Sequence, residues 1–194
     1  RHADEATRTR MDEIISSVDR LNQWIAGLME VARRDPTPTR DLDLTPTLER
    51  VRQAVQPELA VKELTLDLIV PPEGLVCSHD PATLEHVLIA MIVNAIEASP
   101  LGSRIVIRGE KIAANGQGPR CRISVEDRGC GLPPDAPEKI FDFSYSTKQR
   151  GMGLGLGLAR QALQRQGGSA HARNNPEGGA TVYVELPIRS GEKA

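Results

Sequence analysis

Apolar residues near the start of the chain recur in alternating three- and four-residue steps from Met11 to Ala32. Such spacing is the heptad stripe of a long helix, which we place at residues 4–34. One helix cannot bury its own stripe, so this segment needs a partner helix. The Pro- and Thr-containing stretch that follows predicts a linker at 35–42.

The remaining pattern predicts alternating helices and strands. Thr45, as N-cap before Pro46, begins a helix that buries residues as far as Leu59, and Asp80 before Pro81 begins a second that ends near residue 99. Further predicted elements are strands at 64–70, 103–112, 120–126, 169–173 and 180–187, a hairpin turn at 115–118, a long loop at 132–150 with room for one helical turn, and a helix at 153–166. This order predicts an α+β fold in which helices cover one face of a mixed sheet.

Composition narrows the class of protein without identifying it. The 194 residues are 39% hydrophobic and 26% charged, as in ordinary globular domains. A net charge of −2 gives no basic footprint for nucleic acid. The three scattered cysteines suggest neither a metal site nor a disulfide framework, which favours a reducing cytosol. No run is long enough to cross a bilayer. The first residue is Arg1 and not Met, so we expect a piece of a longer protein.

Four glycines alternate with apolar residues in the run 151–157, directly before an apolar helical pattern. Each glycine would cost about 0.5–1 kcal/mol inside a regular element, so the bare backbone must serve another purpose. A loop feeding a helix N-terminus binds anions such as phosphate through free N–H groups and the helix dipole. Lys148 and Arg150 precede the run. They either neutralise phosphate charge or are solvated loop cations.

A second glycine loop follows the predicted strand 120–126, in the order Asp127, Gly129 and Gly131. A carboxylate there could accept a hydrogen bond from the exocyclic amine of a base, with the glycines letting the backbone pass close to a flat ring. The alternative is a plain Asp-Gly turn. Thr181, at the start of the last strand, either supports this acid or simply suits a strand.

Asn94 is an amide within an otherwise apolar helix, on the same face as Val87, Met91 and Ala98. A buried amide costs about 1–3 kcal/mol unless it is hydrogen-bonded. It either binds a hard cation, Mg²⁺, jointly with phosphate oxygens, or is satisfied by nearby backbone.

The order and separation of these motifs resemble the catalytic ATP-binding domain of sensor histidine kinases, in the superfamily of gyrase, Hsp90 and MutL. The resemblance covers about residues 43–187 and implies the Bergerat-type two-layer α/β sandwich. The segment before it resembles the second helix of the dimerisation and phosphoacceptor hairpin. The motifs that carry it are Asn94-x-x-Glu97-Ala98, Asp127-x-Gly129-x-Gly131, Ile140-Phe141, Ser146-Thr147-Lys148, Gly151-x-Gly153-x-Gly155 and Thr181.

The resemblance implies a role for each motif. Asn94 would ligate Mg²⁺, and Asp127 would hold the adenine amino group, with Gly129 and Gly131 beside the base. Residues 132–150 would form the ATP lid. Thr181 would support Asp127 and the adenine. The implied phosphate contacts come from Lys148, Gly151, Gly153 and Gly155.

The sequence departs from the family in three places. No histidine has the acid and proline that follow the family's phosphoacceptor, so we expect this fragment not to phosphorylate itself. Ala90 stands one turn before Asn94, where histidine kinases usually carry Asn and related ATPases carry a water-activating Glu. Phe143 and Ser144 occupy lid positions that are usually Pro and Phe.

The function implied by the resemblance is transfer of the γ-phosphoryl of ATP to a histidine on a helix absent from this chain, for relay to a response regulator. The alternatives are a degenerate nucleotide-binding or interaction module and a serine kinase of the anti-sigma type. The expected partners are a second copy of the chain through residues 1–34, the missing phosphoacceptor helix and sensor domain, and a response regulator. We expect a cytoplasmic location, with residues 43–187 as the catalytic domain and 188–194 as a tail.

Overall fold

The computed structural model describes residues 26, 39–114, 118–133, 137–142 and 155–188. Its elements in chain order are β1 (Arg40–Asp43), α2 (Thr45–Ala54), α3 (Gln56–Val61), β2 (Thr65–Ile69), β3 (Val76–His79), α4 (Pro81–Ala98), β4 (Arg104–Ala114), β5 (Gly118–Glu126), η1 (Pro137–Phe141), α5 (Gly155–Gln164), β6 (Ser169–Asn174) and β7 (Ala180–Pro187).

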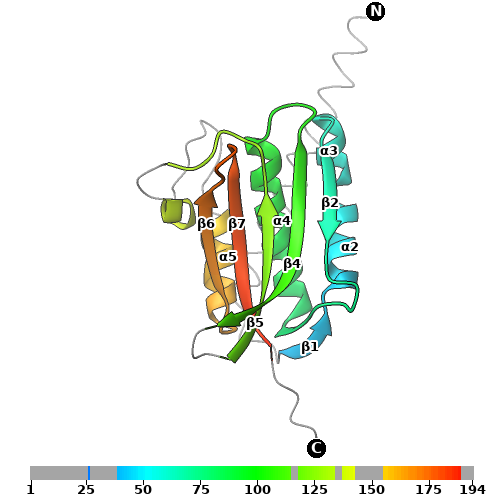
Figure 1. Cartoon of the computed structure of the whole chain (residues 1–194), viewed down its shortest axis with the longest axis vertical. Helices are drawn as coiled ribbons and strands as arrows, with labels where there is room; N and C mark the ends of the chain where they lie inside the picture. The colour runs from blue at the N-terminus through cyan, green and yellow to red at the C-terminus, as the bar shows by residue number, and fades with distance from the viewer. Residues whose placement is uncertain (1–25, 27–38, 115–117, 134–136, 143–154, 189–194) are drawn as a thin grey trace, which may run out of the picture.

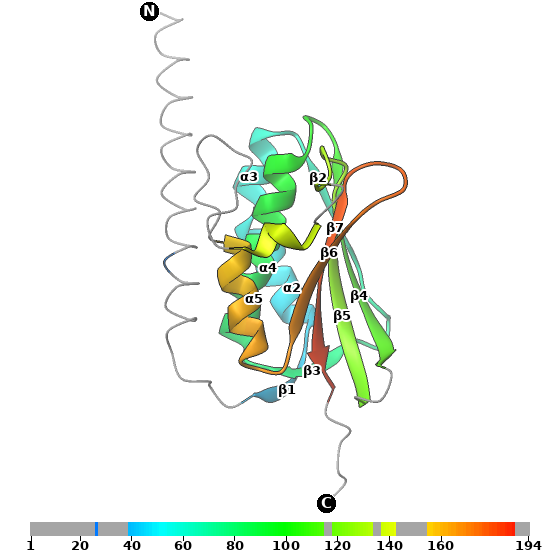
Figure 2. The same cartoon turned by 90° about the vertical axis from the view of Figure 1, so that its left-hand side faces the viewer.

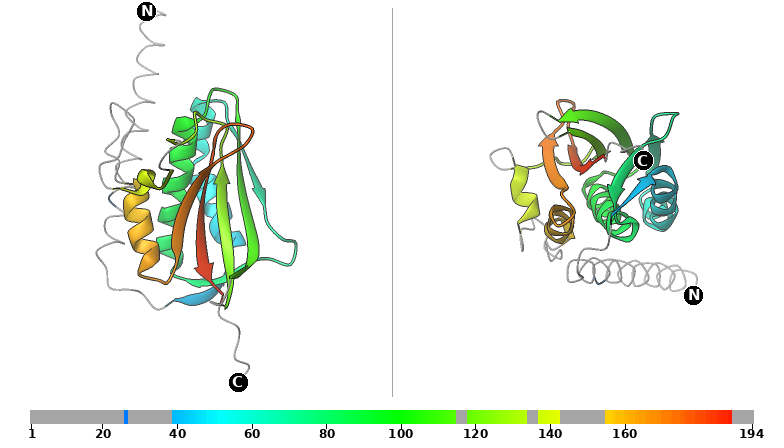
Figure 3. Two further views of the ribbon diagram at one scale, coloured as in Figure 1. Left: turned by 60° about the vertical axis from the view of Figure 1, so that its left-hand side comes forward. Right: turned by 90° about the horizontal axis from the view of Figure 1, so that it is seen from below.

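Five strands form one mixed sheet in the order β2-β4-β5-β7-β6. β2 runs parallel to β4, and the other neighbours are antiparallel. Figure 1 looks onto the sheet with the helices behind it, and Figure 2 shows α2 to α5 on one face. The two layers separate clearly when the molecule is seen from below (Figure 3). The predicted α+β fold with a mixed sheet covered on one face is confirmed.

The long helix α4 lies at the centre of the core. It packs against β5 and against α2 and α5 on either side. Its buried side chains include Leu84, Leu88 and Ile92, which belong to the same core cluster as inward residues of the sheet such as Ile107 and Ile123. Among the described helices α4 alone is long and apolar enough to span a membrane. Its packing is that of a core helix.

The first predicted helix of the domain is wrong in two respects. It is broken at Val55 into α2 and α3, because Pro57 has no N–H with which to continue the hydrogen bonds of α2. Thr45 does not cap α2. Its backbone N–H and its hydroxyl both donate to Asp43 Oδ1, at 2.9 Å each, while Leu44 occupies the N-cap position. The second helix begins as predicted, since Asp80 accepts from the Thr83 N–H at 2.9 Å.

Two short strands were not predicted. β1 pairs with β3 in a separate antiparallel ladder, from Arg40 opposite His79 to Asp43 opposite Val76. β1 includes residues 40–42 of the predicted linker. Each strand has only four residues, which is too short for a period-two pattern to stand out.

The loop predicted at 132–150 contains the one helical turn for which it had room, the 3₁₀ helix η1. The predicted helix 4–34 and tail 188–194 lie outside the described residues, apart from Ala26 and Ile188, and stay predictions.

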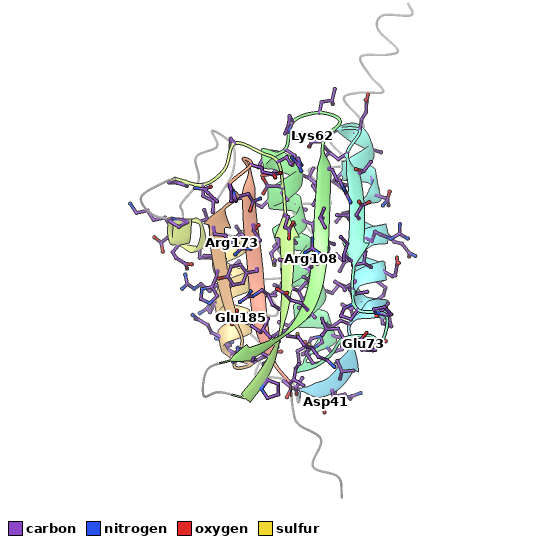
Figure 4. The ribbon with its side chains drawn as sticks, viewed as in Figure 1. Asp41, Lys62, Glu73, Arg108, Arg173 and Glu185 are labelled. Carbon is purple, nitrogen blue, oxygen red and sulfur yellow. The ribbon has the colours of Figure 1, made fainter. Side chains whose placement is uncertain are left out.

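The other face of the sheet carries charged side chains, among them Arg108, Arg173 and Glu185 (Figure 4). Many of them pair across strands. Arg122 of β5 meets Glu185 of β7 at 2.7 Å and lies over the Tyr183 ring at 4.7 Å. This face is therefore covered by ion pairs and ring contacts, and the apolar core lies on the opposite face of the sheet.

Candidate functional site

Asp127 follows β5 directly and is buried, with 5% of its surface exposed. Its Oδ1 accepts from the Gly129 N–H at 2.8 Å and from the Ala180 N–H at 3.2 Å. Its own N–H donates to the Ala180 carbonyl at 2.9 Å. The residue thus makes the Asp-Gly turn given as the alternative interpretation. It also holds a carboxylate inside the fold, where a base amine could donate to it.

Gly129 allows the loop after Asp127 to press on the end of α4. A Cβ at residue 129 would lie 2.5 Å from the Ala98 carbonyl oxygen, a distance that no side chain could occupy. Gly131 has a φ of +77°, which favours glycine, and a Cβ there would lie 2.9 Å from Asn174 Oδ1. Both glycines are therefore required by the close approach of backbone to its neighbours.

Asn94 lies on α4 between two residues that face other segments of the predicted site. One turn earlier, a Cβ added at Gly155 would lie in ordinary van der Waals contact with the Ala90 Cβ, at 3.9 Å. One turn later, Ala98 meets Gly129. At a rise of about 1.5 Å per residue, Ala90 and Ala98 are roughly 12 Å apart along the helix, with Asn94 midway. The three segments around Asn94, Asp127 and Gly155 therefore meet on one stripe of α4.

The Asn94 side chain is half-buried, and among the described residues none donates a hydrogen bond to it or accepts one from it. The alternative interpretation, an amide satisfied by nearby backbone, finds no support in this part of the chain. Its carbonyl oxygen fits a hard cation. No three acidic, histidine or cysteine side chains in the described segments group as a metal site.

α5 is described from Gly155 onward, directly after the predicted glycine run. A glycine-rich loop that leads into a helix N-terminus binds anions. The other predicted phosphate residues, Lys148, Gly151 and Gly153, lie outside the described residues together with Arg150. Their part in the site stays a prediction.

Thr181 is buried, but its contact with Asp127 is indirect. Its hydroxyl donates to Asn175 Oδ1, and Asn175 Nδ2 donates to the Asp127 carbonyl at 3.3 Å. Ala180 and Val182 point into the core, so strand alternation turns Thr181 to the other face. The residue thus supports the backbone at Asp127 through the hairpin between β6 and β7.

Two residues of this hairpin were missed by the sequence reasoning. Asn174 and Asn175 both hydrogen-bond the loop after β5. The available signal was the turn-rich sequence from Asn174 to Gly179, which predicts a hairpin but not what it touches.

The turn η1 is anchored beside the site. Glu138 pairs with Arg160 of α5 at 3.1 Å and lies 3.7 Å from His171 of β6. Phe141 is buried, and the Arg160 guanidinium lies 5.1 Å from its ring. These contacts fix the described middle of the predicted lid against α5 and β6.

Residues 79–190 match the family described as histidine kinase-, DNA gyrase B- and HSP90-like ATPase. Over 175 residues the chain is 30% identical to the sensor histidine kinase ZraS of Klebsiella oxytoca, covering 90% of this chain and 37% of that protein. It is 28% identical to the signal transduction histidine-protein kinase AtoS of Escherichia coli K12, covering 90% of this chain and 28% of that protein. The chain thus spans about a third of the length of these relatives.

Solved structures show the same fold. The nucleotide-free catalytic domain of histidine kinase ThkA superposes with a TM-score of 0.68 at 26% identity, covering 78% of this chain and 96% of that one. ThkA in complex with the response regulator TrrA superposes with a TM-score of 0.71 at 23% identity, covering 93% of this chain and 51% of that one.

Proposed function

Because the chain belongs to the family of histidine kinase-, DNA gyrase B- and HSP90-like ATPases, we propose that it is the ATP-binding catalytic portion of a sensor histidine kinase. The γ-phosphoryl of ATP passes to a histidine on a phosphoacceptor helix outside this chain, and from there to a response regulator. Two observations support this: the similarity to ZraS and AtoS over 90% of the chain, and the likeness to a kinase solved with its response regulator.

The observation that carries the proposal is the position of Asn94. A half-buried amide on an apolar helix, unpartnered by the described residues, lies midway between the Asp127 loop and the start of α5. Its carbonyl oxygen would ligate Mg²⁺, which, when bound, supplies charge neutralisation at the phosphates.

At the base end of the site, the Asp127 carboxylate accepts a hydrogen bond from the adenine amino group. The Gly129 and Ala180 N–H groups fix one oxygen of the carboxylate and so orient the whole group. Gly129 and Gly131 lie beside the base. Thr181 acts through Asn175, which holds the backbone at Asp127.

At the phosphate end, we assign the backbone N–H groups of Gly151, Gly153 and Gly155, together with Lys148, to the phosphates. Catalysis then rests on positioning and on neutralising charge.

Ala90 favours phosphoryl transfer over hydrolysis. Residue 90 stands one turn before Asn94 and ends in a methyl group, so this position offers no carboxylate to activate water. General-base help is worth about 10²–10⁴ in rate, and its loss would leave a hydrolase slow.

We further propose that residues 4–34 form the second helix of the dimerisation hairpin and that the chain pairs with a second copy through it. Light scattering at high concentration would then give the mass of a dimer, whereas a monomer would contradict this assignment. Since ATP and response regulators are found in the cytoplasm, we place this portion there.

Phosphotransfer tests the main proposal. The chain is mixed with the phosphoacceptor hairpin of its parent protein and γ-labelled ATP. If the label on the hairpin is removed by acid but not by base, it is phosphohistidine, and the result supports a histidine kinase. ATP binding without transfer would instead identify a nucleotide-binding module, and label that survives acid but is released by base would indicate a serine kinase.

A further inference from the structure

The connection between β6 and β7 lies at the end of the sheet where β5 ends (Figure 1). Asn174 ends β6, and its side chain makes two hydrogen bonds with the backbone of one residue in the loop after β5. Oδ1 accepts from the Leu132 N–H at 2.7 Å, and Nδ2 donates to the Leu132 carbonyl at 3.1 Å. A single amide thus satisfies both backbone groups of Leu132.

Asn175 holds the other end of the same loop. Its Nδ2 donates to the Asp127 carbonyl at 3.3 Å while its Oδ1 accepts from the Thr181 hydroxyl. The hairpin itself is closed by the Asn175 N–H donating to the Gly179 carbonyl at 3.0 Å. Gly179 has a φ of +78°, and a Cβ there would collide with the Asp127 carbonyl, so the hairpin lies directly on the loop.

Residues 127–132 are therefore held at both ends by two adjacent asparagines and pressed against α4 at Gly129. We propose that Asn174 is a positioning residue for nucleotide binding, because it closes the loop that carries Asp127, Gly129 and Gly131. This inference rests on the proposed function, which places the adenine beside that loop.

Both Asn174 bonds lie at an exposed site, where a hydrogen bond adds little to the stability of the whole domain. Their effect is local. With Asn174→Ala the loop stays fixed at Asp127 but opens from Leu132, so bound nucleotide escapes faster. We expect the dissociation rate to rise about 5- to 20-fold with little change in the association rate, since interface changes act mainly on dissociation.

The experiment uses stopped-flow fluorescence with a mant-labelled ATP analogue and Mg²⁺ on the whole chain, together with hydrogen exchange at the Leu132 amide. Asn174→Ala should accelerate dissociation and Leu132 exchange while the melting temperature stays near that of the wild type. Asn174→Asp keeps an acceptor for the Leu132 N–H and should recover part of the loss. Glu177→Gln on the same hairpin, whose exposed pair with Arg128 spans 3.7 Å, is the matched control and should behave as wild type.

Three outcomes would overturn the inference. Unchanged dissociation despite faster exchange at Leu132 would show that the bonds form but do not position the site. A large fall in melting temperature with exchange raised throughout the domain would reduce Asn174 to a structural residue. Absence of analogue binding by the wild type would defeat the proposed function as well, which distinguishes that failure from the first two.

Discussion

At the scale of single residues, Asp127 combines a structural and a proposed binding role that two substitutions can separate. Asp127→Asn keeps an oxygen for the Gly129 and Ala180 N–H groups, so the fold should persist. Its new NH₂ group would face the adenine amine, so that two hydrogen-bond donors meet without an acceptor. ATP affinity should therefore fall at least about 10-fold. Calorimetric titration with ATP and thermal unfolding measure the two effects.

Asp127→Ala is the contrasting variant, because it leaves two backbone N–H groups without their acceptor. We expect it to lower the free energy of unfolding by about 1–3 kcal/mol as well as removing ATP binding. Equal ATP affinity for Asp127→Asn and the wild type would defeat the assignment of this carboxylate to adenine.

Two glycines of the site should respond differently to alanine. Gly155→Ala meets only ordinary contact, with Ala90 at 3.9 Å, and alanine favours helix, so stability should hold or rise by up to about 1 kcal/mol. ATP affinity should nevertheless fall if phosphate lies against this backbone. Gly129→Ala would drive a methyl group onto the Ala98 carbonyl and should cost about 1–3 kcal/mol of stability.

Urea unfolding and nucleotide titration of both variants check this contrast. A stable Gly155→Ala variant with wild-type affinity would remove Gly155 from the site.

At the scale of elements, α4 depends on a cation from a neighbouring turn. Lys62 follows α3, and its Nζ donates to the carbonyls of Ile96, Glu97 and Ser99 at 2.8, 3.0 and 3.0 Å (Figure 4). These carbonyls have no intrahelical donor, and a positive charge suits the negative end of the helix dipole.

Lys62→Met keeps the apolar stem and removes the charge. It should lower the free energy of unfolding by about 1–2 kcal/mol in urea titration, with Lys111→Met on β4 as the exposed control. If the two variants were equally stable, the hydrogen bonds from Lys62 to the end of α4 would contribute nothing to the stability of the domain.

Helices and strands could be predicted from the sequence wherever one face is apolar over several helical turns or several strand residues. α4 and the five sheet strands follow from periodicity, and Asp80 marks the start of α4 by its chemistry. The break between α2 and α3 depends on one proline against an otherwise continuous apolar stripe. β1 and β3 exist because they pair with each other, a long-range event that four residues of local sequence cannot encode.

At the scale of the whole molecule, His79 links stability to pH. Its ring is 1% exposed, its Nδ1 lies 3.1 Å from Cys77 Sγ, and its Nε2 has no partner among the described residues. Burial lowers the pKa of His79 below its usual 6.5. As pH falls through 6.5 the unfolded chain takes up this proton first, so the contribution to stability is present above 6.5 and is lost below it.

The wild type should therefore lose stability between pH 7.5 and 5.5 by up to about 1.4 kcal/mol for each pH unit below the unfolded pKa. His79→Gln should flatten this dependence in urea unfolding at the two pH values. His86→Gln on α4 is the control and should retain the wild-type dependence. An equal slope for wild type and His79→Gln would show that another group causes the acid sensitivity.

The site could be anticipated only in part. Asp127, Gly129 and Asn94 stand out because their residue types are costly where they occur. Their meeting on one stripe of α4 depends on the folded chain. Asn174 and Asn175 carry no such signal, since asparagine is common in turns and only the hairpin's approach to residues 127–132 gives these two a partner.

The ladder between β1 and β3 has a mechanical consequence. β1 is the first described strand, and β3 leads through Asp80 directly into α4. A pull on the chain upstream of Arg40 would act on these four rungs, beginning at the pair of Arg40 and His79, before it could reach α2. Tension would then act on the root of the helix that bears Asn94, and not on the turns of α2.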